Sequence, residues 1–120
     1  MKPHTRRAVA LIAGSITSGT QPSSVYDYSE SKHFNFSGEA TPQHVDVYDY
    51  TQHCHINGSG GSGSFYLYHY GNSKHIDLSL QGSSFQGYDY DSRNHFSGTV
   101  SGSSVSLYDH DGGKYFNYSV

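Results

Sequence analysis

Histidine, a side chain that often binds metals or transfers protons, recurs along this chain at a nearly fixed spacing. The chain has nine His, and four of them, His33, His55, His75 and His95, fall 22, 20 and 20 residues apart. Neighbouring imidazoles in a column could share Zn or Cu. A column at strand spacing brings together two ring nitrogens at best, and no Cys/His pair has a recognised ligand spacing. We therefore predict no metal site and interpret these histidines as polar rings that stack on tyrosine.

Asp, His and Ser are also the residues of many catalytic sites, but here they recur in every repeat. An active site is a single constellation, whereas these residues do not converge once. The Gly-rich stretch "NGSGGSGS" has no Lys-Ser/Thr ending and no following helix, so it is not a phosphate-binding loop. We predict a protein that is not an enzyme, with no catalytic residues and no cofactor.

The repeated residues belong to five units of about 20 residues. Each unit has a triplet of aromatic residue, acid and aromatic residue, with His in place of the acid in the third unit. A turn rich in Gly, Asn, Asp and Ser follows, and a ring stands seven residues after the first tyrosine. The two extra residues of the first interval lie in "SGEATPQH", where Pro42 indicates a loop insertion. Each unit therefore predicts a strand, a tight turn, a second strand and a Gly/Ser turn.

Period-two alternation sorts the side chains of each unit onto two faces. The inward face is apolar, with Val45, Val47 and Ile56 in one unit, and large residues are offset by glycines in another. The acid of the triplet also points inward, as Asp27, Asp49, Asp89 and Asp109, with His69 in the third unit. The outward face is aromatic and polar.

Two all-β architectures satisfy this alternation. In a β-solenoid each repeat is one rung, and equivalent residues stack about 4.8 Å apart. In a ten-stranded antiparallel meander or barrel each repeat is a hairpin, and equivalent strands lie two apart. The solenoid is preferred, although stacked carboxylates would repel each other by roughly 3 kcal/mol at an effective dielectric of 20.

The last repeat, "SSVSLYDHDGGKYFNYSV", resembles the curlin repeats of bacterial curli fibres, with alternating apolar residues on both sides of a Gly-containing turn. The likeness covers about residues 23–120 and is architectural. It implies a two-sheet β-solenoid that polymerises into functional amyloid. The chain departs from curlin chemistry because Asp occupies the position of the family's inward Gln.

The N-terminal segment differs from the repeats. Residues 1–22 combine basic residues with a short apolar run, which predicts a signal-like leader or flexible segment, and residues 23–120 form the five-repeat β domain. Cys54 is the single cysteine, so no internal disulfide can form. A net charge of -3 without a basic stripe argues against nucleic acid, and no segment is long enough to span a membrane.

The exposed rings are the candidate site, because contiguous aromatic surface commonly marks contact with a partner. This predicted assembly or ligand face consists of Tyr26, Tyr48, Tyr68, Tyr88, Tyr108, Tyr28, Tyr50, Tyr70, Tyr90, His33, His55, His75, His95 and Tyr115. Candidate glycosylation sites recur on the same face at Asn35, Asn57 and Asn117.

These features predict a structural protein whose partner is another copy of itself. It would be a self-assembling subunit of an extracellular or cell-surface β-rich, amyloid-like fibre, since uncapped solenoid ends promote growth. The alternative is a carbohydrate-binding or adhesive module that stacks sugars on its Tyr/His face. An ice-binding role ranks third, because ice-binding faces favour Thr over bulky Tyr.

Overall fold

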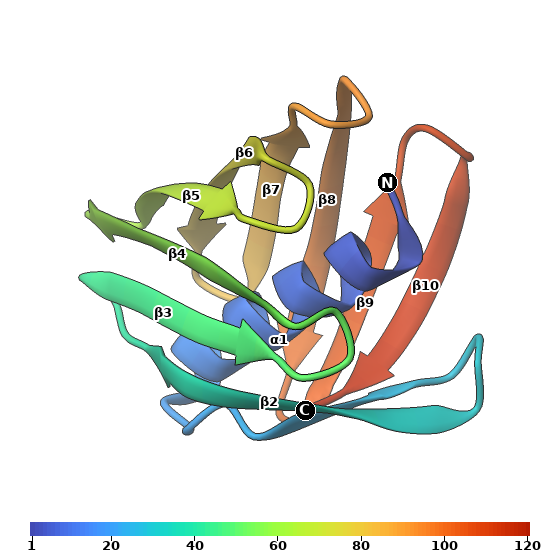
Figure 1. Cartoon of the computed structure of the whole chain (residues 1–120), viewed down its shortest axis with the longest axis horizontal. Coiled ribbons are helices and arrows are strands. Elements are labelled where there is room, and N and C mark those ends of the chain that lie inside the picture. Colours follow the sequence, from blue (N-terminus) through green and yellow to red (C-terminus); the bar gives the residue numbers. More distant parts are fainter.

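The chain forms a closed antiparallel barrel of ten strands around one helix, as Figure 1 shows for the computed structural model of residues 1–120. The elements are α1 (Pro3–Ser18), β1 (Ser24–Asp27), β2 (Lys32–Ala40), β3 (His44–Asp49), β4 (Cys54–Gly61), β5 (Ser64–His69), β6 (Lys74–Gln81), β7 (Ser84–Asp89), β8 (Asn94–Ser101), β9 (Ser104–Asp109) and β10 (Lys114–Ser119). Each strand pairs with its neighbours in sequence, and β10 pairs with β1 to close the wall.

The preferred β-solenoid is therefore wrong, and so is the interpretation of the tandem repeats as stacked rungs. Each repeat is one hairpin of a single wall, in which Tyr48 pairs with His55 and Tyr68 with His75. Equivalent strands are separated by one intervening strand instead of lying on each other. The all-β class and the barrel alternative describe the observed fold.

Helix α1 lies inside the barrel, where Figure 1 shows the strands curving around it. Its residues from Thr5 to Ser15 are buried, apart from Arg6, and a helix buried on all sides suits an all-round apolar sequence. Pro3 begins the first turn, and Gly19 ends the helix in a left-handed conformation at φ 69°. The segment expected to be a leader or flexible N-terminus thus supplies the centre of the core.

The inward face predicted from the alternation is the barrel's inner wall. Val45, Val47 and Ile56 are fully buried there. The predicted offset of large residues by glycines is also present, as Phe96 pairs with Gly87 and Phe85 with Gly98. A Cβ on either glycine would lie 2.4 Å from the tip of a phenylalanine ring, so the rings fill the space that the glycines leave. The complete cluster is formed by α1 and all ten strands.

The inward Asp residues form a ring at one end of the barrel, and their placement removes the expected repulsion. They come from β1, β3, β7 and β9, so neighbouring carboxylates in the ring are roughly 10 Å apart or more, twice the interstrand spacing. Each Oδ1 accepts a backbone N–H from the following turn, for example from Ser29 to Asp27 at 3.0 Å and from Asp111 to Asp109 at 3.0 Å. The column is thus a set of turn caps.

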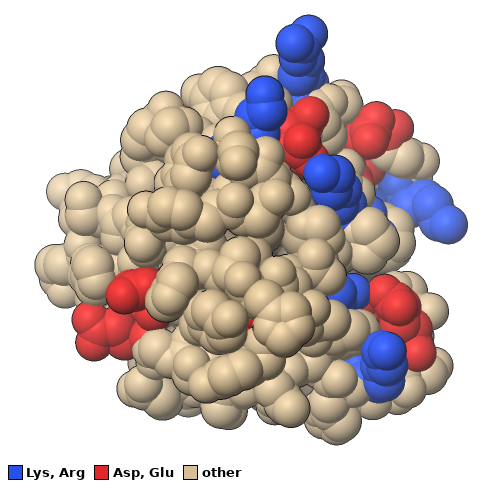
Figure 2. All heavy atoms as spheres, viewed as in Figure 1, with Lys and Arg blue, Asp and Glu red and all other residues tan.

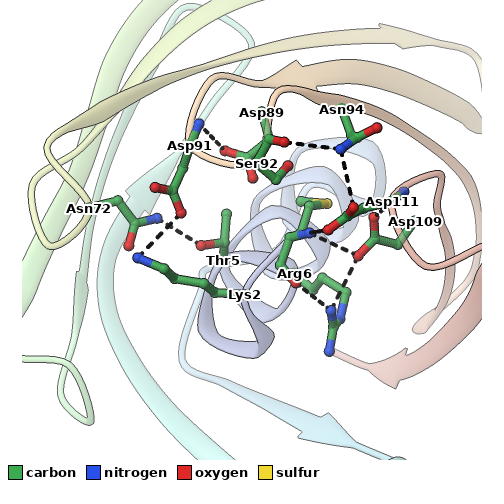
Figure 3. Close-up of polar contacts among 11 residues, drawn as sticks. Lys2, Thr5, Arg6, Asn72, Asp89, Asp91, Ser92, Asn94, Asp109 and Asp111 are labelled. Atoms are coloured by element: carbon green, nitrogen blue, oxygen red, sulfur yellow. Dashed lines mark hydrogen bonds and ion pairs between the residues drawn. The ribbon is translucent and has the colours of Figure 1, made fainter.

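The first turns of α1 connect to this ring through charged and polar contacts, which Figure 3 shows. Lys2 lies 3.3 Å from Asp91, and the Asn72 amide donates to the Thr5 hydroxyl at 2.8 Å. The amino group of Met1 lies 3.1 Å from Asp109. The contacts come from the turns after β5 and β7 and from the end of β9, so they hold the helix to the wall on several sides.

The hairpins do not all join in the same register. Between three pairs of hairpins the contacts repeat regularly, as in Ile56 with His69 and Ile76 with Asp89. At β2–β3, Asp49 pairs with Phe36. Phe36 lies two positions further along its repeat than Ile56 lies along its own. The insertion near Pro42 therefore shifts the pairing of neighbouring hairpins and is more than a loop.

The same two-residue shift occurs where β1 meets β10, the seam that closes the barrel. Only two pairs are formed there, Tyr26 with Ser119 and Asp27 with Tyr118. Two adjacent helix arginines reach the strands on either side of the seam. Arg7 lies 3.6 Å from Asp27, and Arg6 lies 3.2 Å from Asp109. Their guanidinium groups also lie 3.5 Å and 3.7 Å from the centres of the Phe34 and Phe116 rings.

Candidate ligand-binding surface

The outer wall carries five clusters of three aromatic rings, one in each hairpin. In each cluster a central tyrosine contacts the ring two residues later, just past the end of its own strand, and the ring opposite it on the next strand. Centroid distances are between 4.7 and 5.1 Å, with edge-on geometry. The clusters are Tyr26–Tyr28–His33, Tyr48–Tyr50–His55, Tyr68–Tyr70–His75, Tyr88–Tyr90–His95 and Tyr108–His110–Tyr115.

All residues predicted for the aromatic face therefore lie on the outer wall, but as separate clusters and not as continuous columns. The five central tyrosines are half-buried. The outer tyrosines of the clusters are exposed, with Tyr28 at 60% and Tyr115 at 67%. In each cluster, contacts with two other rings fix the position of the central ring. The outer rings keep faces that a ligand can reach.

The largest groove on the wall lies across β6, β7 and β8, reaches His110 just after β9, and has a volume of about 550 Å³. It is lined by Asp77, Ser79, Gln86, Gly87, Tyr88, His95, Phe96, Ser97 and His110. Outward pairs across the strands create it: Ser79 lies opposite Gln86, and Gln86 lies opposite Ser97. These short or flexible polar side chains leave a hollow beside the taller Tyr88 cluster, which we call the Asp77 groove.

Asp77 lies between two tyrosines in this groove and is hydrogen-bonded to a third. Its strand partners are Tyr66 on β5 and Tyr88 on β7, both on the outer face. The Tyr90 hydroxyl donates a hydrogen bond to Asp77 Oδ2 at 2.9 Å. This bond raises the pKa of Tyr90, and the neighbouring Tyr66 and Tyr88 contribute to the same shift. Tyr66 also stacks on His75, with ring centroids 4.3 Å apart and planes at 10°.

Further hollows follow the outer wall on both sides of this groove. One of about 400 Å³ adjoins it and includes Tyr66, Asp77 and Ser79. Another of about 450 Å³ includes Tyr28, Thr99 and Asn117. Their walls alternate aromatic rings with hydroxyl and amide groups, so the outer wall offers several neighbouring positions for a polar ligand. The candidate glycosylation residues Asn35 and Asn117 are exposed and Asn57 is half-buried.

The histidines of the predicted column are held apart by the intervening strands, and each contacts the tyrosine of its own hairpin. No group of three or more His, Cys, Asp or Glu side chains is arranged to hold a metal ion. Cys54 is a free, buried thiol whose pKa is raised, chiefly by burial. The side chains that meet on the outer wall can therefore offer ring faces, hydroxyl and amide hydrogen bonds and, in the Asp77 groove, a carboxylate.

Sequence reasoning found the rings of this surface but missed Asp77, Gln86 and Tyr66. Asp77 occupies the position held by Asn57 in the repeat before it, and Tyr66 occupies the position held by Asp46. These are places where the repeats differ from one another, and the comparison of repeats searched for what they share. Departures from the repeat were the signal that could have located the groove.

No helix is both long and apolar enough to cross a membrane. Comparison of the chain with protein families, curated proteins and solved structures finds no match. The resemblance to curlin repeats therefore has no support from a relative, and the solenoid that it implied is not the fold. The geometry of the outer wall is what points to a function.

Proposed function

We propose that the protein is a carbohydrate-binding or adhesive module that holds sugars against the outer wall of its barrel. The Asp77 groove carries the proposal, because it sets hydroxyl, amide and carboxylate groups beside the rings of Tyr88 and His95. Sugar rings offer apolar C–H faces that stack on aromatic rings, and hydroxyl groups that bond to polar side chains. Adjoining hollows suit an extended glycan with several sugar units.

The self-assembling fibre predicted from the sequence is supported less well. That prediction depended on solenoid ends with unpaired backbone groups, and a closed barrel has no such edge because β1 and β10 are paired. A binding module needs only the outer wall as it stands. It also suits the extracellular or cell-surface location predicted from the sequence, where glycans are abundant.

A glycan array tests the proposal, with the bound sugars then titrated by calorimetry. Replacing Tyr88→Ala removes the central ring of the groove and should weaken binding at least tenfold, while circular dichroism shows that the barrel is retained. Tyr66→Ala, which removes a ring that lines the adjoining hollow, should weaken binding of longer glycans.

Tyr48→Ala is the matched control, because Tyr48 has the same place in its hairpin but lines none of these grooves. Its affinity should equal that of the unmodified protein. Absence of glycan binding, or equal loss in Tyr48→Ala and Tyr88→Ala, would contradict the proposal.

A further inference from the structure

Asp77 stands in an arrangement that no other repeat contains. The outward residues that pair across β5, β6 and β7 are Tyr66, Asp77 and Tyr88. The hydroxyl of Tyr90, two residues after Tyr88, donates a hydrogen bond to the Asp77 carboxylate. The corresponding row of the preceding repeat is Asp46, Asn57, Tyr68. Only the third repeat therefore places a carboxylate between two phenol rings.

Asp77 is also the one outward carboxylate of the barrel wall without an ion pair. The other two, Glu39 and Asp46, lie 3.8 Å from His44 and 3.3 Å from His55. Asp77 has no ion pair, and its hydrogen-bond partner is a neutral phenol.

The basic side chains of the protein are gathered elsewhere. All seven Lys and Arg residues lie at the start of α1, in a hairpin turn or at the first strand residue after such a turn: Lys2, Arg6, Arg7, Lys32, Lys74, Arg93 and Lys114. None lines the Asp77 groove. On the face drawn in Figure 2 the blue atoms of Lys and Arg gather toward the top and right. Asp77 therefore has no Lys or Arg beside it in the groove.

A carboxylate flanked by aromatic rings is suited to an ammonium group. The carboxylate accepts a charge-assisted hydrogen bond from the cation, and a tyrosine face attracts the same charge through its π electrons. Tyr66 is 54% exposed, so one face of the ring remains accessible although the ring stacks on His75. A sugar hydroxyl group has no charge, so its hydrogen bond to the carboxylate is weaker and it makes no cation–π contact with the ring.

Resting on the proposed carbohydrate-binding function, we propose that the Asp77 groove selects amino sugars, with the ligand ammonium bound by Asp77 between Tyr66 and Tyr88. The remaining polar residues of the groove, Gln86 and Ser97, bond to sugar hydroxyl groups. The ligand class is a glycan with free primary amines, as in oligomers of glucosamine.

Two ligands with the same sugar backbone test this selectivity: glucosamine oligomers, which carry ammonium groups, and N-acetylglucosamine oligomers, which do not. We expect calorimetry at low ionic strength to give about tenfold tighter binding of the amine form to the unmodified protein. Asp77→Asn keeps an oxygen that can accept from Tyr90 but removes the charge, so the two oligomers should then bind within about twofold of each other. Tyr66→Leu should reduce the preference while leaving Asp77 in place.

Asp46→Asn is the matched control, since it removes an outward carboxylate that already has His55 beside it. This variant should keep the tenfold preference. Equal binding of both oligomers to the unmodified protein, or a preference that survives Asp77→Asn, would overturn the amino-sugar assignment and leave the carbohydrate-binding function standing. Binding of neither oligomer, with no other glycan bound, would overturn both.

Discussion

At the scale of single residues, the barrel shows how one repeated position serves different environments. The inward acid of each triplet caps a turn by accepting its backbone N–H, and His69 does the same in the third repeat, accepting from the Asn72 N–H at 3.1 Å through Nδ1. Its ring is fully buried, and Nε2 has no partner. Burial, with a smaller contribution from His4, lowers the pKa of His69 to about 4.

This burial predicts that stability depends on pH through His69. Above pH 6.5 the imidazole is neutral in both the folded and unfolded chains, so it imposes no penalty. As the pH falls from about 6.5 toward 4, His69 is protonated in the unfolded chain but stays neutral in the folded protein. The free energy of unfolding therefore decreases by up to about 3 kcal/mol. His69→Asn keeps an acceptor for the turn but does not titrate, so it should lose less stability over this range.

Urea unfolding of both proteins at intervals from pH 7.5 to 4.5 measures the difference. The other titrating groups are common to both, and the comparison therefore isolates His69. His95→Asn, at an exposed position of the outer wall, should follow the unmodified protein. Parallel curves for His69→Asn and the unmodified protein would contradict the assignment.

At the scale of elements, the helix and the wall depend on close contact. Gly14 faces Val105 and Val120, and a Cβ at Gly14 would lie 3.0 and 2.7 Å from methyl carbons of those residues. Small residues on α1 let the helix fit inside the barrel. Ten strands leave room for this helix, whereas eight leave an interior just wide enough for side chains.

Gly14→Ala should destabilise the protein even though alanine favours a helix. Helix propensity contributes up to about 1 kcal/mol in its favour, while overpacking a filled core costs about 1–3 kcal/mol. We expect a net loss of about 1 kcal/mol by chemical denaturation. Gly112→Ala, at a turn position with open space around it, should lie within 0.5 kcal/mol of the unmodified protein. A Gly14→Ala variant more stable than this control would show that the helix has room to move.

The elements also show what the sequence allowed us to predict. Alternation within Val45–Val47 and Phe65–Leu67 predicted the two faces, and the runs of Gly, Asn, Asp and Ser predicted the hairpin turns, because both depend on neighbours in the chain. Alternation could not distinguish a barrel from a solenoid, since both bury the same alternate residues. The pairing that closes the barrel, Asp27 with Tyr118, joins the first repeat to the last and does not depend on neighbours in the chain. Helix α1 was missed because a short apolar run after Lys2, Arg6 and Arg7 has the layout of a signal segment.

At the scale of the whole molecule, closure is its weakest point by backbone pairing. The seam has two residue pairs, whereas β9 and β10 share six. Arg6 and Arg7 link the two flanking hairpins to the helix from inside. The barrel is therefore held closed at the seam by side chains of its core as much as by its backbone.

Arg7→Met tests this arrangement by removing the cation beside Asp27. Breaking a buried ion pair leaves an uncompensated charge and should cost about 3–5 kcal/mol. In hydrogen exchange, the Tyr28 amide, which donates across the seam to Asn117, should lose more protection than the Tyr70 amide, which donates to His55. Lys2→Met, which removes an exposed pair with Asp91, should cost about 1 kcal/mol or less. Equal loss of protection at Tyr28 and Tyr70 would indicate global unfolding instead of seam opening.

The position of the helix inside the wall has a consequence for how the chain folds during synthesis. Residues 3–18 leave the ribosome before any strand, yet their binding site is complete only when residues 114–119 have been made. The apolar helix must therefore wait, unburied, for the strands that cover it, and N-terminal elements cannot fold first as they do in many proteins. Pairing the first strand with the last also joins distant parts of the chain, which slows folding. Closure of the seam and enclosure of the helix are thus a single late event.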